Sequence, residues 1–232
     1  MHLHRRKFNT FAMSAGALVI VPVQAQGLAA LTSADASRGL KQALQKGGEV
    51  AVQLLGAHDG FWGNDKVRIA LPDAVNKAGK LLKSLGMGQQ LDELNLQMNR
   101  AAEAAVPKAQ KWLTQAIETM SVQDAKSILQ GGDDSVTQFF ASKTREPLTV
   151  EFMPTVKQSL EKLGVVNQFN AVAVKLTGMG LLDKDKAKLE THVTAKTLDG
   201  LYFMIGEEEK KIRQNPAQAG SAILTKVFGA LR

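Results

Sequence analysis

The chain has 232 residues, a formal net charge of +7, an aromatic content of 5% and no cysteine. Without a thiol, the protein can form no disulfide, cysteine nucleophile or thiolate metal site. Basic residues alternate with acids and aromatic residues are few, which argues against a nucleic-acid-binding face.

The first 25 residues have the three parts of a cleavable signal peptide. A basic patch is followed by an apolar run from Phe11 to Val23 and by Val23-Gln24-Ala25, which suits a signal peptidase. The apolar run is roughly 13 residues, whereas a membrane-spanning helix needs about 20. We therefore expect a mature chain of residues 26–232, beginning at Gln26, without a transmembrane helix.

The same segment bears on the export route. Arg5-Arg6, followed by Lys7 and Phe8, resembles the twin-arginine signal for proteins that fold before export, while an ordinary basic region would serve the Sec route. Both routes stay open at this point. Either one predicts a periplasmic protein.

After the leader, helix-period segments alternate with glycine and proline, and no sustained alternating run indicates a sheet. We predict an all-α, single-domain bundle of about 8 to 10 helices. The expected helices are, in chain order, 33–56, 72–85, 89–120 with a kink or break at 107, 121–130, one that starts at 133 or 134, 147–163, 167–177, 183–214 as the longest, and 215–228. Residues 57–72 form the longest irregular segment, with room for a short extended piece at 67–71.

Several dispersed strings carry a family resemblance: DASRGL at 35–40, DGF at 59–61, VRIALP at 67–72, MNRAAE at 98–103, GGDD at 131–134, LDGL at 198–201 and EEEKKIR at 207–213. On these strings the chain resembles the bacterial domain-of-unknown-function family 4197. The resemblance implies an exported envelope protein and implies no reaction, ligand or cofactor. Many relatives look like lipoproteins, whereas this chain lacks the cysteine for a lipid anchor.

Polar residues inside apolar helices are the first candidates for a site. Asn99, Arg100 and Glu103 occupy neighbouring turns of one expected helix, because positions three and four apart share a face. Arg100 and Glu103 could form a structural pair within the helix or reach across to other helices.

The acidic residues are the second set of candidates. Asp134 and Asp199 are candidate ligand-binding positions, but the acids lack the spacing of an EF-hand loop or a di-iron bundle, and we predict no metal site. Asp133 and Asp134 fit helix caps, and Glu207 to Glu209 fit a solvated face paired with Lys210, Lys211 and Arg213. His58 and His192 are the two histidines beyond the leader, a weak basis for imidazole chemistry.

The aromatic pair Phe61 and Trp62 stands on the irregular segment. One interpretation is that the loop folds back onto the bundle. The other is that the pair helps to line an apolar ligand cavity. Its further lining would come from Met98, Phe139, Phe152, Phe169 and Phe203.

These observations favour a non-enzymatic periplasmic protein that binds an apolar small molecule, a lipid or an envelope protein. Its candidate ligand-binding residues are Phe61, Trp62, Asn99, Arg100, Glu103, Asp134 and Asp199. The alternative is a periplasmic enzyme that uses buried Arg, Glu and Asp residues, with or without a divalent metal. A third hypothesis is an interaction protein that binds an acidic envelope surface, which leaves peripheral membrane association open.

Overall fold

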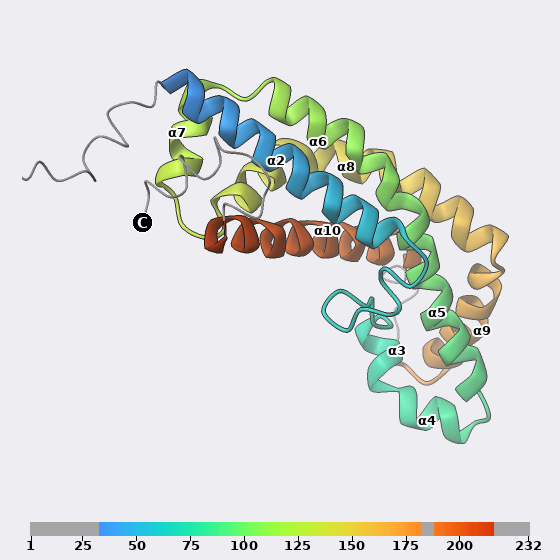
Figure 1. The fold of residues 1–232 in the computed structure, drawn as a ribbon. Helices are drawn as coiled ribbons and strands as arrows, with labels where there is room; N and C mark the ends of the chain where they lie inside the picture. Colours follow the sequence, from blue (N-terminus) through green and yellow to red (C-terminus); the bar gives the residue numbers. More distant parts are fainter. Residues whose placement is uncertain (1–32, 182–187, 216–232) are drawn as a thin grey trace, which may run out of the picture.

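The computed structural model describes residues 33–181 and 188–215, and these residues are helical with no strand among them (Figure 1). The all-α prediction is therefore confirmed. The expected signal peptide at 1–25, the helix cap at Asp183 and the last expected helix, 215–228, lie wholly or almost wholly outside the described residues.

The helices are α2 Ser33–Gly56, α3 Asp73–Lys77, α4 Gly79–Ser84, α5 Gly88–Ala105, α6 Ala109–Glu118, α7 Val122–Gln130, α8 Ser135–Lys162, α9 Val165–Gly178 and α10 Leu189–Gln214. A 3₁₀ turn, Val106–Lys108, joins α5 to α6 and contains Pro107. The predicted break at Pro107 is confirmed, because proline fits the first turn of a helix and interrupts a continuing one.

Helix α8 differs from the prediction of two helices meeting at Pro147. It is one helix of 28 residues that contains both Pro147 and Pro154, so it is longer than the 26-residue α10 within the described chain. Buried residues at four-residue spacing form a row along one face of α8 and continue past both prolines. The row consists of Val136, Phe140, Thr144, Leu148, Phe152, Val156 and Leu160. Proline leaves the carbonyls of Lys143 and Val150 without a helical donor, and both of these residues are exposed.

The region predicted as one helix at 72–85 is two short helices, α3 and α4, separated at Ala78. Gly79 begins α4, and glycine favours a helix interior less than other residues except proline. The predicted capping box at the start of α7 is confirmed, since Ser121 Oγ accepts from Asp124 N and the Asp124 carboxylate accepts from Ser121 N.

The helices form a long body and a tip at one end. In Figure 1, α2, α6, α8 and α10 lie side by side in the body, whereas α3, α4 and α9 gather around the first part of α5. We call residues 73–87 and 163–181, which contain α3, α4 and α9, the tip. Helix α7 lies at the opposite end of the body.

Helix α8 receives its N-terminal cap from another helix. Asp134 stands at the N-cap position, but its side chain makes no cap hydrogen bond, so the prediction that it caps α8 is wrong. Glu209 of α10 performs this role instead, accepting from Val136 N at 3.2 Å and Thr137 N at 3.3 Å. Arg213 pairs with Glu209 at 2.9 Å. A carboxylate is favourable at a helix N-terminus, where unpaired N–H groups point outward.

The acidic run at 207–209 is accordingly only in part a solvated face. The expected pairs exist, joining Glu207 to Lys210 and Glu208 to Lys211. Glu208 and Glu209 are nevertheless buried, with 8% and 4% of their surface exposed. Burial raises the pKa of the Glu209 carboxyl, against the hydrogen bond from Val136 N and the pairing with Arg213, which act to lower it.

Candidate functional site

The irregular segment 57–72, which we call the loop, crosses the junction between α5 and α10 (Figure 1). The backbone of its first turn packs closely against the end of α2. Asp59 adopts a left-handed conformation with φ of 64°, which Asp tolerates better than most residues. A Cβ atom on Gly60 would stand 2.4 Å from the carbonyl oxygen of Leu54, so only glycine fits there.

Glu103 of α5 fixes the centre of the loop. Its Oε1 accepts hydrogen bonds from two consecutive backbone N–H groups, those of Phe61 at 3.1 Å and Trp62 at 3.2 Å. The Glu103 side chain is 7% exposed, so these donors would otherwise lack a partner in a dry environment. The carboxylate thus replaces the helix or sheet partner that an irregular backbone lacks.

Arg100 joins Glu103 to the first turn of the loop. Its Nη1 donates to Glu103 Oε2 and its Nη2 donates to Asp59 Oδ1, both at 2.7 Å. The hydrogen bond from Arg100, with a smaller contribution from His58, lowers the pKa of Asp59 below its ordinary value. The Arg100–Asp59 pair therefore stabilises the folded protein at pH values above the ordinary pKa of aspartate. This stabilisation is lost as the pH falls through the lowered pKa of Asp59.

Asn99 holds the end of the loop with its amide group. Its Oδ1 accepts from Ile69 N at 2.8 Å, and its Nδ2 donates to Ile69 O at 3.0 Å. The side chain thus satisfies both polar groups of one buried residue, as a neighbouring strand would. His192 of α10 adds a contact to the next residue, with its Nε2 2.9 Å from Ala70 O. The place considered for an extended piece forms no strand.

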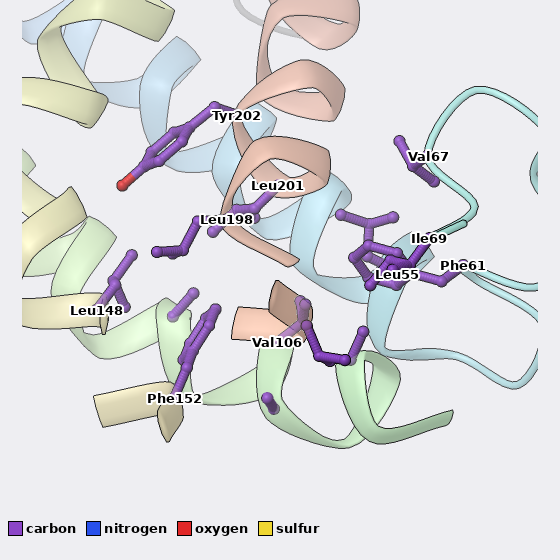
Figure 2. Close-up of a cluster of buried hydrophobic side chains, with 14 of the residues drawn as sticks. Leu55, Phe61, Val67, Ile69, Val106, Leu148, Phe152, Leu198, Leu201 and Tyr202 are labelled. Atoms are coloured by element: carbon purple, nitrogen blue, oxygen red, sulfur yellow. The ribbon is translucent and has the colours of Figure 1, made fainter. Parts of the chain in front are cut away.

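Phe61 folds back into the bundle, as one of the two sequence interpretations expected. Its side chain is fully buried, and a Cβ atom on Gly200 would stand 2.7 Å from Phe61 Cε1. Figure 2 shows Phe61, Ile69 and Val67 grouped beside Leu55, with Leu148 and Phe152 on the other side of α10. Because Gly200 has no side chain, the surface of α10 leaves space there for the Phe61 ring.

The outer surface of the loop carries aromatic rings covered by cations. The Arg68 guanidinium lies 5.0 Å from the centre of the Trp62 ring, while its Nε donates to Trp62 O at 2.6 Å. Lys66 Nζ lies 5.9 Å from the ring centre of Phe203 on α10, which is 41% exposed. Such contacts hold each ring in place at the surface.

The further residues considered from the sequence as cavity lining belong mostly to the packed core. Met98 and Phe152 are fully buried in the core, Phe139 and Phe169 are almost so, and Phe203 faces outward. An apolar cavity of about 20 Å³ lies instead between α2, α8 and α10. That volume is close to the room that one water molecule needs.

Asp199 and Asp134 lie apart from the loop cluster. Asp199, half exposed on α10, pairs with Arg145 at 3.2 Å and Lys196 at 3.5 Å. Asp134, exposed before α8, accepts a hydrogen bond from Gln138. The structure therefore brings together five of the seven candidate positions, Phe61, Trp62, Asn99, Arg100 and Glu103, and leaves these two aspartates outside the group.

Several residues of the cluster were not identified from the sequence as members of a site. They are Asp59, Arg68, His192 and Gly200, together with Asn64 and Met204, which are joined by a contact of 3.8 Å from Asn64 Nδ2 to Met204 Sδ. Gly200 carried a usable signal, because glycine inside an otherwise helical pattern costs about 1 kcal/mol relative to alanine and often has a packing reason. Asp59 and Gly60 carried another signal, because they are a turn-forming pair three and four positions after the end of α2.

The chemistry open to this cluster is limited by its own hydrogen bonds. Both oxygens of Glu103 and both terminal nitrogens of Arg100 are engaged within the protein. A general acid or base needs a free atom within hydrogen-bond reach of a substrate proton, whereas these atoms are already bonded to the loop and to each other. In the part of the chain that the structure describes, no three His, Asp or Glu side chains are grouped to hold a metal ion.

Comparison with known protein families gives a match over most of the chain. The family described as "Protein of unknown function (DUF4197)" matches residues 30–229. No curated protein and no solved structure matches the chain. Within the described ranges, no helix has the length and apolar character needed to cross a membrane.

Replacing Glu103 should release the loop. We expect Glu103→Ala to lower the free energy of unfolding by roughly 3 kcal/mol, because two buried N–H groups lose their acceptor and Arg100 loses its partner. Glu103→Gln should cost less, since its amide oxygen still accepts. Urea unfolding measures both values, and hydrogen exchange should show faster exchange at the Phe61 and Trp62 amides. Glu118→Ala, an exposed change on α6, should stay within about 0.5 kcal/mol of wild type; an equal loss there would contradict the assignment.

Filling the space at Gly200 should expel Phe61. We expect Gly200→Ala to destabilise the protein by about 1 to 3 kcal/mol through overpacking, although alanine favours a helix. Gly79→Ala is the control, because a Cβ atom there meets nothing within 4 Å. Adding Phe61→Leu to Gly200→Ala should cost less than the sum of the two single changes in urea unfolding. Strict additivity would show that the two residues do not compete for space.

Proposed function

The chain belongs to the family described as "Protein of unknown function (DUF4197)", and we propose that it is a non-enzymatic, exported protein that presents the rigid loop to a protein partner. The observation that carries this proposal is the use of Asn99, Arg100 and Glu103. Their polar atoms hold loop backbone in one conformation and are not turned to an open cleft.

A rigid, irregular segment is a suitable recognition surface. Binding residues often stand on loops held by a rigid scaffold, since little conformational entropy is then lost on binding. Tryptophan and arginine, here Trp62 beneath Arg68, are among the residues that contribute most to protein interfaces. Phe203 beneath Lys66 extends the aromatic surface onto α10.

The charges on this surface favour aromatic contact over electrostatic attraction. Lys66 already pairs with Glu207 at 2.7 Å, and Arg68 pairs with Asp65 at 2.9 Å. Exposed pairs of this kind contribute little free energy, but they leave no excess of positive charge on the loop. Recognition here would therefore change little with salt, unlike attachment to an acidic envelope surface.

The geometry supports a protein partner better than the other ligands considered. The apolar cavity of about 20 Å³ is too small for an apolar metabolite or an acyl chain, and the wider hollow along α2 is open and lined mainly by charged and polar side chains. The alternative of an enzyme draws on Arg100 and Glu103, whose charged groups are engaged within the protein, and on two aspartates that lie elsewhere.

Site-specific photocrosslinking in living cells tests the loop as the recognition surface. The photoreactive residue p-benzoylphenylalanine replaces Trp62 or Phe203 in the full chain, and Val150, 72% exposed on α8, is the control position. We expect one adduct of the same mass from positions 62 and 203 and none from 150. Adding Glu103→Ala should reduce the adduct at least about tenfold at equal protein level, since the loop loses its anchor. Equal adducts at all three positions, or none, would overturn the proposal.

The leader is the basis for proposing export. We expect the protein in the periplasmic fraction after osmotic shock, with Gln26 at its N-terminus. Arg5→Lys with Arg6→Lys keeps the charge and should block export only if the twin-arginine route is used. A cytoplasmic protein with an intact N-terminus would contradict export, irrespective of the outcome of the crosslinking.

A further inference from the structure

The tip exposes an unusual share of the apolar side chains. Of the eleven exposed large hydrophobic residues in the described chain, seven belong to the tip. They are Leu81, Leu85, Leu163, Val166, Val174, Met179 and Leu181. Single exposed apolar residues are ordinary, but seven within two segments at one end of the molecule mark the tip as a candidate interaction surface.

Helix α9 shows how these residues are arranged. Val165, Phe169, Val172 and Leu176 form its buried face. Val166 and Val174 stand two turns apart on the other face, with 39% and 68% of their surface exposed. Leu163 and Met179, which flank the two ends of α9, are also exposed. An outward face of α9 is therefore partly apolar along the whole helix.

The charges on the tip are mostly positive. Residues 163–181 contain Lys175 and no acid, and residues 73–87 contain Lys77, Lys80 and Lys83 and one acid, Asp73. Lys162 lies directly before the tip, next to Glu161. Lys83 pairs with Asp92 at 3.7 Å, whereas the other four lysines are exposed and form no ion pair among the described residues. The intervening 182–187 carries two lysines and two aspartates, which adds no net charge.

Apolar side chains interspersed with unpaired lysines fit the surface of an anionic bilayer. In that setting the apolar groups enter the boundary of the acyl chains while lysine ammonium groups meet lipid phosphates. A second copy of the chain fits less well, because a symmetric contact through the tip would bring like charges together.

We propose that the tip, through the outer face of α9, docks this protein peripherally on a membrane surface rich in anionic lipid. This surface is separate from the loop, so its test does not depend on the function proposed for the loop. The body and the loop would then extend away from the bilayer.

Vesicle co-sedimentation of the full chain tests this inference. Vesicles of phosphatidylcholine with about 30% phosphatidylglycerol should bind the protein, and vesicles of phosphatidylcholine alone should bind it at least about tenfold more weakly. Val174→Ser with Lys175→Gln should weaken binding to the anionic vesicles at least about tenfold. One lysine accounts for about fivefold of this, and the lost apolar contact accounts for the rest.

A matched control stands at the far end of the body. Val122→Ser with Lys126→Gln makes the same two changes on α7, where Val122 is 60% exposed, and should keep binding within about twofold of wild type. Both variants carry the same N-terminus, so any contribution of the leader cancels. Thermal unfolding within about 2 °C of wild type shows that each variant is folded.

Three results would overturn the inference. The first is the absence of binding by the wild-type chain to anionic vesicles. The second is an equal loss of binding in the α9 and α7 variants. The third is unchanged vesicle binding in the α9 variant together with a smaller mass in sedimentation equilibrium, which would assign the α9 face to contact between two copies of the chain.

Discussion

The conformation of the loop depends on one carboxylate that accepts two consecutive backbone N–H groups. An irregular segment that crosses a helical core must satisfy its polar backbone without a ladder of its own. Glu103 does so at Phe61 and Trp62, and Arg100 compensates the charge that Glu103 brings into the interior. A buried carboxylate without such compensation would cost several kcal/mol. The pair is therefore required by the loop more than by α5, which could form without it.

Glu209 and Arg213 repeat this solution at the other end of the body. In both places a helix carries a glutamate and an arginine one turn apart, and the glutamate accepts from two consecutive N–H groups of a distant segment. The arginine also reaches beyond its partner, from Arg100 to Asp59 and from Arg213 to the carbonyl of Ile128. Long charged side chains thus connect segments that apolar packing alone would leave loosely oriented.

The sequence was sufficient to predict what depends on periodicity and local turn chemistry. The all-α class, the break at Pro107 and the capping box at Ser121 each depend on neighbouring residues, and each is confirmed. The continuity of α8 was missed because local rules place a helix boundary at proline, whereas the buried row from Val136 to Leu160 outweighs that preference. The single-domain organisation stays a prediction.

The site was predictable only in its residue types. Polar residues within apolar helices correctly pointed to Asn99, Arg100 and Glu103 as members of a cluster. Their partners are up to 42 residues away for α5 and more than 120 residues away for α10, a separation that no local pattern encodes. Asp134 shows the converse error, since its local cap signal was sound but a distant glutamate takes the role.

The loop and α10 are far apart in the sequence, and this separation affects the order in which their contacts form. During synthesis the loop and α5 emerge long before His192, Gly200 and Met204, and contacts across such separations form late. Until α10 is in place, Phe61 has no space at Gly200 to enter, and Ala70 lacks its contact with His192. The finished surface of the loop therefore exists only on a chain that has folded through α10, so a partner that recognises it distinguishes completed molecules from nascent or truncated ones.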